Sequence, residues 1–150
     1  MEKTLIKLCN LFDDHNIRFG IGASLLLKSY GIVDKASDID LIVHIDDVKQ
    51  VQELMDKMGV VQKSSDTTLY FSEVFLEYNV EGVDVDIMSN FTIKTGEDFY
   101  VYPFCVEEIQ RRGEAQLPYL SLREWEKAYR LMGRIWKADL VLDYLEKRNS

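Results

Sequence analysis

The stretch Ser37-Asp38-Ile39-Asp40-Leu41-Ile42-Val43 decides the fold: it reads as an apolar strand with two aspartates at its entrance. Residues i and i+2 of a strand point to the same face, so Asp38 and Asp40 are expected to project side by side. Adjacent like charges repel unless a positive charge lies between them, and carboxylate oxygens suit Mg²⁺ or Mn²⁺. The simpler interpretation is a solvated strand end with two incidental acids, and the pair alone favours it. Other features of the chain are needed to distinguish the two.

A run of small residues, Gly22, Ala23 and Ser24, precedes this strand. The run follows a predicted short strand at 17–21 and opens a predicted helix at 23–30. Small residues at a helix N-terminus allow a phosphate to approach backbone N–H groups, and the Ser24 hydroxyl adds a donor. Many helices begin with such residues as ordinary caps, so this feature alone is weak evidence.

A second pair of acids lies in Val83-Asp84-Val85-Asp86-Ile87, a later segment whose alternation also predicts a strand. If this strand lies beside the one at 39–45, one of its carboxylates can join Asp38 and Asp40. Three carboxylates around two cations about 3.5–4 Å apart are typical of two-metal phosphoryl or nucleotidyl transfer.

The remaining elements predict an α/β (α+β) domain with a mixed β-sheet that is flanked by helices and followed by C-terminal helices. Strands are predicted at 67–87 and in a hairpin at 91–104, and helices at 2–15, 46–58, 106–112 (a short one), from Ser121 and after Gly133. Glu124 stands three positions after Ser121, which matches a capping box. We expect a single domain over 1–150, with a core at about 17–104 and a C-terminal helical part at about 105–150.

Composition and cysteine content indicate the cellular compartment that we expect for the protein. The chain has 150 residues, 47% hydrophobic and 29% charged, which is ordinary for a soluble globular protein. No apolar run approaches the roughly 20 residues of a membrane span, and the N-terminus lacks the features of a signal peptide, so we expect no membrane partner. Cys9 and Cys105 have no metal-ligand spacing and fit reduced thiols, which indicates a cytoplasmic location.

The formal net charge of −8 bears on the binding partners. An acidic chain gains little from counterion release on a polyanion, so nucleic-acid binding would need a local basic patch or a second subunit. The charge therefore favours a small-molecule substrate or a protein partner.

Three motifs together resemble the signature of the nucleotidyltransferase superfamily, the polymerase-β-like fold. They are IGAS at 21–24, SDIDLIV at 37–43 and VDVDIMS at 83–89. The closest likeness is to the small bacterial group that includes lincosamide and aminoglycoside nucleotidyltransferases and AbiEii-type toxins. The tail GRIWKADLVLDYL is also similar, with Arg134 and Lys137 in the family's order before a final helix.

The resemblance implies roles for individual residues. Four are implied in nucleotide binding: Gly22, Ala23, Ser24 and Lys137. Three are implied as catalytic ligands of two Mg²⁺ or Mn²⁺ ions: Asp38, Asp40 and Asp86. Asp86 is preferred because the residues that follow it match the family pattern, and Asp84 remains the alternative. An exposed helix lysine is an equally good interpretation of Lys137.

The implied function is metal-dependent transfer of an NMP from an NTP to an acceptor hydroxyl, with release of pyrophosphate. The acceptor would be a small molecule such as an antibiotic, or a protein or tRNA. The alternative is a non-catalytic module that binds a nucleotide or a partner and keeps the fold, for example in a toxin–antitoxin pair. The family's larger acceptor domain is absent from so short a chain, and a homodimer or a partner could complete the acceptor site.

Aromatic residues gather in the C-terminal part: Tyr100, Tyr102, Trp125, Tyr129 and Trp136. They could form a stacking platform for a nucleobase. Packing in the core or at an interface is the alternative, and it is favoured for most of them.

Overall fold

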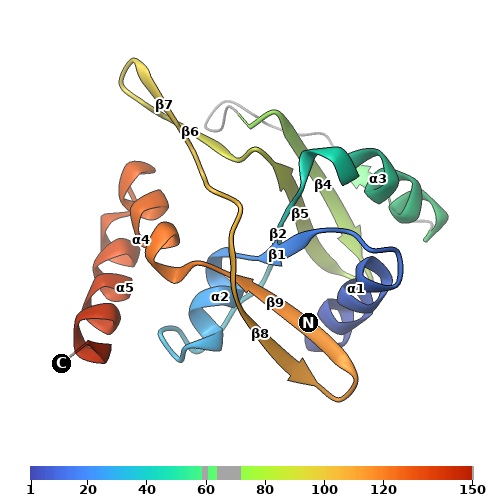
Figure 1. Cartoon of the computed structure of the whole chain (residues 1–150), viewed down its shortest axis with the longest axis horizontal. Helices are drawn as coiled ribbons and strands as arrows, with labels where there is room; N and C mark the ends of the chain where they lie inside the picture. Colours follow the sequence, from blue (N-terminus) through green and yellow to red (C-terminus); the bar gives the residue numbers. More distant parts are fainter. Residues whose placement is uncertain (59–60, 64–71, 150) are drawn as a thin grey trace.

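A mixed seven-stranded sheet forms the centre of the computed structural model, which describes residues 1–58, 61–63 and 72–149 (Figure 1). Its strands lie in the order β3-β4-β5-β2-β1-β9-β8. Their bounds are β1 Phe19–Ile21, β2 Ile39–Val43, β3 Val61–Lys63, β4 Val74–Val80, β5 Val83–Ser89, β8 Val106–Arg112 and β9 Ala115–Leu120. A separate two-stranded sheet pairs β6 (Thr92–Thr95) with β7 (Asp98–Val101), which is the hairpin predicted at 91–104.

Strand β2 lies in the middle of the sheet, as its nearly continuous apolar sequence predicts. Ile39 and Leu41 are fully buried. The strand pairs in parallel with β5 and antiparallel with β1, and the register places Asp40 directly opposite Asp86. The predicted contact between the two aspartate-bearing strands is therefore confirmed, as is the mixed sheet of the α+β class. Residues 67–71 of the predicted strand region lie outside the described part.

The described residues form five α-helices and one short 3-10 helix: α1 Glu2–Asp14, α2 Ala23–Ser29, η1 Ile45–Asp47, α3 Val48–Lys57, α4 Leu122–Leu131 and α5 Ile135–Arg148. Helix α1 buries an apolar stripe that includes Leu5, Leu8 and Phe12. It covers the face of the sheet that carries Phe19, because the rings of Phe12 and Phe19 meet edge to face at 5.3 Å. None of the helices in the described part is both long and apolar enough to cross a membrane.

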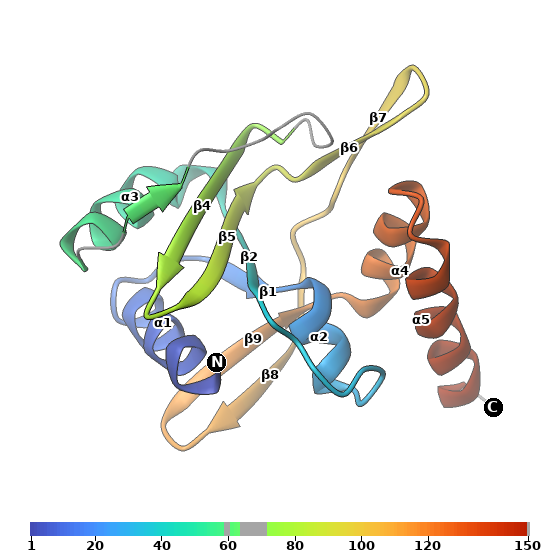
Figure 2. The same ribbon diagram turned by 180° about the vertical axis from the view of Figure 1, so that it is seen from behind.

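Helices α4 and α5 stand at the side of the sheet, away from α1 (Figures 1 and 2). The Oγ atom of Ser121 accepts a hydrogen bond from the backbone N–H of Glu124 at 3.3 Å, which confirms the predicted N-cap of α4. Gly133, with φ of +83°, separates the two helices as predicted. Together they form one wall of a cavity whose opposite wall is the sheet.

One predicted element is wrong, because residues 106–112 form strand β8 rather than a short helix. β8 pairs antiparallel with β9 through a turn in which Gly113 has φ of +62°. Along β9, the buried residues Ala115, Leu117 and Tyr119 alternate with partly exposed ones, which is the period of a strand. Pairing with β9 outweighs the weak helical pattern of β8. The C-terminal part is therefore a β-hairpin followed by two helices.

Candidate active site

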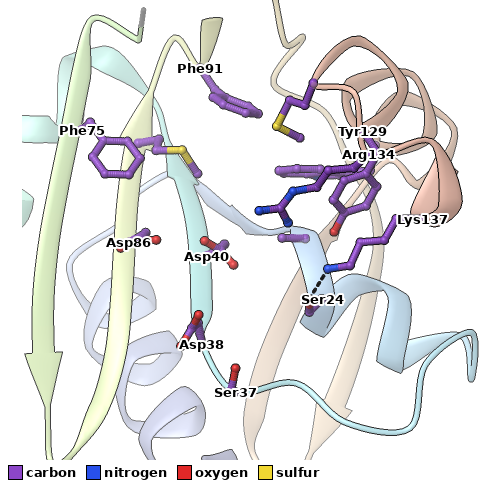
Figure 3. Close-up of a pocket in the computed structure, with 14 residues that line it drawn as sticks. Ser24, Ser37, Asp38, Asp40, Phe75, Asp86, Phe91, Tyr129, Arg134 and Lys137 are labelled. Carbon is purple, nitrogen blue, oxygen red and sulfur yellow. Dashed lines mark hydrogen bonds between the residues drawn. The ribbon is translucent and has the colours of Figure 1, made fainter. Parts of the chain in front are cut away.

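The aspartates of β2 and β5 line a cavity of about 270 Å³ between the sheet and the C-terminal helices (Figure 3). Its polar lining residues are Ser24, Ser37, Asp38, Asp40, Asp86, Arg134 and Lys137. The other lining residues are apolar or aromatic: Ala23, Phe75, Met88, Phe91, Trp125, Tyr129 and Met132. Figure 3 shows Ser24, Ser37 and Asp38 toward one end, and the rings of Phe75 and Phe91 toward the other. The cavity therefore has a polar end and an apolar end.

Strand register brings three carboxylates to this cavity. Asp40 and Asp86 are direct cross-strand partners, and Asp38 lies two residues before Asp40 on the same face. Burial, and then the neighbouring charges of Asp86 and Asp38, raise the pKa of Asp40 to about 8. The pKa of Asp86 is raised to about 6, mainly by burial. With no cation bound, Asp40 therefore keeps its proton near neutral pH.

A backbone hydrogen bond ties the run of small residues to the aspartate strand. The N–H group of Gly22 donates to the carbonyl oxygen of Asp40 at 2.9 Å. Ala23 follows with φ of +52°, a left-handed conformation that residues with a Cβ rarely adopt. Ser24 lies in the first turn of α2, where its Oγ accepts a hydrogen bond from Lys137 Nζ at 3.3 Å. The turn thus fixes the Ser24 hydroxyl on the cavity wall.

Replacing Ala23 by glycine is expected to raise the free energy of unfolding by about 0.5–1 kcal/mol. The left-handed conformation costs an L-residue about 1–2 kcal/mol, and the greater freedom of glycine in the unfolded chain cancels part of the gain. Urea unfolding of the two proteins measures the difference. A glycine variant that is less stable than the wild type would show that Ala23 is not strained.

Gly22 is needed for the close approach of α4. A Cβ atom at this position would lie 2.5 Å from Cζ2 of Trp125, which is too short for two carbon atoms. Trp125 is only 2% exposed, and its ring stacks on Phe91 with 5.6 Å between centroids. The structure therefore gives Gly22 a packing role, in addition to the phosphate approach predicted from the sequence.

Lys137 and Arg134 bring positive charge to the cavity. Burial and the neighbouring charge of Arg134 lower the pKa of Lys137, while the nearby carboxyl of Asp40 partly raises it again. The Nζ atom of Lys137 lies 5.3 Å from the centre of the Tyr129 ring, within the range of a cation–π contact. Lys137 is therefore a cavity residue, and the alternative of an exposed helix lysine is not what the structure shows.

The raised pKa of Asp40 predicts a pH-dependent stability in the absence of divalent cations. The unfolded chain ionises this carboxyl near 3.8, whereas the folded protein keeps it protonated up to about pH 8. The stability that the neutral carboxyl contributes is full below about pH 4 and is lost as the pH rises to about 8. Urea unfolding with a chelator measures the free energy of unfolding of Asp40→Asn and of the wild type. The difference, variant minus wild type, should increase by at least about 1 kcal/mol between about pH 5 and pH 8. The same difference in free energy of unfolding at both pH values would contradict this expectation.

Most of the predicted site residues meet at the cavity. Those that line it are Ala23, Ser24, Asp38, Asp40, Asp86 and Lys137. Gly22 is not a lining residue, but it adjoins the cavity through its backbone bond to β2. Asp84, the alternative third carboxylate, does not line the cavity and accepts a hydrogen bond from Asn79 Nδ2 at 3.1 Å. The structure thus places Asp86 rather than Asp84 beside the first two acids.

Several lining residues were not predicted. Met88 could have been found, because it follows Asp86 at i+2 on the same face of β5. Phe75 is the cross-strand partner of Met88, and only the pairing of β4 with β5 reveals it. Met132 comes from the far wall, and no local pattern indicates its place.

Comparison with solved structures identifies the fold. A candidate nucleotidyltransferase from Thermotoga maritima is similar with a TM-score of 0.69 and 20% identity, over 97% of this chain and 92% of that chain. The chain has the nucleotidyltransferase fold. The fold that the resemblance implied is therefore confirmed by the whole arrangement of strands and helices; Asp40 lies on the central strand of this fold, and Asp38 lies just before it.

The antibiotic-resistance factor ANT(2'')-Ia also has a similar structure. In complex with adenylyl-2''-tobramycin it gives a TM-score of 0.55 and 12% identity, over 98% of this chain and 99% of that chain. Its solution structure gives a TM-score of 0.54 and 12% identity, over 99% and 95% of the two chains. No family model and no curated protein matches the sequence. The likeness of this chain to nucleotidyltransferases is thus one of fold.

Proposed function

We propose that this protein transfers a nucleoside monophosphate from an NTP to an acceptor hydroxyl and releases pyrophosphate, with Mg²⁺ or Mn²⁺ required. The observation that supports this most strongly is a single cavity with walls of opposite charge. Asp38, Asp40 and Asp86 line it from the sheet, and Arg134 and Lys137 line it from the start of α5. Such a cavity suits a divalent cation on one wall and phosphate oxygens on the other.

The chemistry of the carboxylate wall fits a divalent cation. Among the described residues, no group of three or more His, Cys, Asp or Glu side chains is arranged to hold a metal ion as it stands. Asp40 instead holds a proton when no cation is bound, because burial and the charges of Asp86 and Asp38 raise its pKa. Oxygen ligands of this kind are those that Mg²⁺ prefers, and a cation held by Asp38, Asp40 and Asp86 would replace that proton. Bound there, it would neutralise phosphate charge and lower the pKa of the acceptor hydroxyl.

The opposite wall would hold the triphosphate. Lys137 provides a point charge, Arg134 a second cation, and the Ser24 hydroxyl lies 3.3 Å from Lys137 Nζ. Phosphates held there would turn the α-phosphorus toward the carboxylates. The acceptor hydroxyl would then approach in line from the side of Asp86 and give its proton to that carboxylate, and its oxygen would form a bond to phosphorus as the bond to pyrophosphate breaks.

The acceptor that we propose is a hydroxyl of a small molecule or a protein. ANT(2'')-Ia, a protein of the same fold, was solved with adenylyl-2''-tobramycin, a small molecule that bears an adenylyl group. The net charge of −8 disfavours a long polyanion as acceptor. A cytoplasmic location, where NTPs and Mg²⁺ are available, is part of the proposal.

Label transfer tests the proposed function. The protein is incubated with Mg²⁺, a cell extract and each of the four NTPs in turn, labelled at the α-phosphate. We expect label to pass to at least one acceptor, and to remain in the NTP when EDTA is added or when the Asp38→Asn/Asp40→Asn variant replaces the wild type. Binding of MgNTP with no transfer would indicate the non-catalytic module instead. Transfer that persists in EDTA would contradict the metal requirement.

Replacing Lys137 by alanine is expected to weaken MgNTP binding by about 10- to 100-fold, because a charge-assisted bond contributes about 1.5–3 kcal/mol. Lys147→Ala is the matched control, since Lys147 lies on the same helix but pairs with Asp143 at 3.0 Å on the exposed surface. Isothermal titration calorimetry measures both affinities. Equal affinities for the two variants would remove Lys137 from the phosphate site.

A further inference from the structure

The structure separates the C-terminal aromatic residues by exposure. Tyr102, Trp125 and Tyr129 are at most 2% exposed and pack as a cluster. Tyr100 is held by a hydrogen bond from its hydroxyl to Glu124, and the Lys127 ammonium lies 4.5 Å above its ring. Trp136, in contrast, is 64% exposed. Of the five aromatic residues that the sequence singled out, Trp136 is therefore the one whose ring is open to a ligand.

Trp136 does not itself line the cavity, but its ring lies near the lining residue Lys137. The Nζ atom of Lys137 lies 5.6 Å from the centre of this ring and 3.3 Å from Ser24 Oγ. A single ammonium group thus links the open indole to the cavity wall. The two side chains are neighbours at the start of α5, so their relative position is fixed by the helix.

We propose that Trp136 is the surface on which the base of the bound NTP stacks. This inference rests on the proposed function, because it takes the phosphates to lie against Lys137 and Ser24. A nucleotide held by its phosphates extends its base several ångströms away, which is the scale of the distance from Lys137 Nζ to the indole. Every base has a π-face, and stacking on an indole provides affinity without hydrogen bonds to the base edge.

This mode of binding predicts how strongly the protein distinguishes one NTP from another. Stacking on an exposed indole depends on the area of the base and not on its hydrogen-bond donors and acceptors. We therefore expect ATP, GTP, CTP and UTP to bind within about tenfold of one another, with purines above pyrimidines because of their larger stacking area.

A second copy of this chain is the competing occupant of this surface. Ile135, Leu140 and Leu142 are also exposed on α5, by 45%, 42% and 36% of their surface. A protein partner would cover these side chains together with Trp136. A base would cover the indole, which lies 5.6 Å from Lys137 Nζ, and would leave the other three side chains exposed.

Binding measurements on surface variants test the inference. MgATP affinity is expected to fall about 5- to 100-fold in Trp136→Ala and to stay within about fivefold in Trp136→Phe, which keeps a ring. Affinity for magnesium tripolyphosphate, which has no base, should be unchanged in both. Ile135→Ala is the matched control and should bind MgATP like the wild type. Unchanged MgATP affinity in Trp136→Ala, or an equal loss for tripolyphosphate, would overturn the assignment.

Fluorescence gives an independent readout, because the chain has two tryptophans and one of them is buried. MgATP is expected to quench the wild-type emission, while tripolyphosphate and Trp136→Phe should show little quenching. Quenching that survives in Trp136→Phe would place the base elsewhere and overturn the inference. So would a wild-type dimer that Trp136→Ala converts to a monomer with unchanged MgATP affinity. If the wild type binds neither MgATP nor tripolyphosphate, the proposed function itself fails and the inference with it.

Discussion

Replacing Asp40 by asparagine is expected to lower nucleotidyl transfer by about a thousandfold, because the metal contributes several kcal/mol to transition-state stabilisation. Asp40 lies between Asp38 and its cross-strand partner Asp86, so it is the centre of the carboxylate wall. Asparagine keeps the size of the side chain and removes its charge. The initial rate of label transfer from an α-labelled NTP measures the effect.

Asp84→Asn is the matched control for this experiment. Asp84 is also an acid of β5, but it bonds to Asn79 and does not line the cavity. We expect its replacement to leave the transfer rate within about threefold of the wild type, as for a group outside the reacting site. Similar losses in Asp84→Asn and Asp40→Asn would mean that general acidity of the surface, and not the carboxylate wall, supports the activity.

Replacing Gly22 by alanine is expected to lower the free energy of unfolding by about 2–3 kcal/mol, the upper part of the usual range for overpacking. The new Cβ would lie 2.5 Å from Cζ2 and 2.7 Å from Nε1 of Trp125, whose ring is buried and packs against Phe91 and Tyr129. The transfer rate should fall as well, since the Gly22 N–H group holds the turn to β2. Urea unfolding and the label-transfer rate measure the two effects.

A double variant identifies the cause of this loss. In Gly22→Ala/Trp125→Phe, the smaller ring leaves room for the new methyl group. The two changes should therefore cost less together than the sum of the single changes, by at least about 1 kcal/mol. Additive losses would show that the clash with Trp125 is not the reason for glycine at this position.

Short-range patterns were sufficient to predict the site acids. Asp40 and Asp86 stand in predicted strands and Asp38 just before one, and the parallel pairing of β2 with β5 then brings them together as predicted. The Ser121 cap and the glycine break between α4 and α5 were equally local and were also confirmed. Residues a few positions apart thus predicted the single elements, whereas the contact of β2 with β5 joins segments that are far apart in the sequence.

Features that depend on contacts between distant segments were missed. Residues 106–112 have no strong pattern of their own and become a strand through pairing with β9. The packing of Trp125 on Gly22 exists only when α4 lies against the turn, and no local pattern indicates the left-handed conformation of Ala23. Trp125 and Trp136 are chemically identical, and only the fold decides that one is buried and the other is open.

The proposed chemistry requires a cation on the carboxylate wall, where burial and the neighbouring carboxylates raise the pKa of Asp40 when no cation is bound. Electron paramagnetic resonance can follow a titration of the protein with Mn²⁺ in the presence of a non-hydrolysable NTP analogue. We predict that the wild type binds Mn²⁺ at least about tenfold more tightly than Asp38→Asn/Asp40→Asn, as expected when charged ligands are lost. Equal Mn²⁺ affinity in the two proteins would contradict the assignment of these aspartates as the metal site.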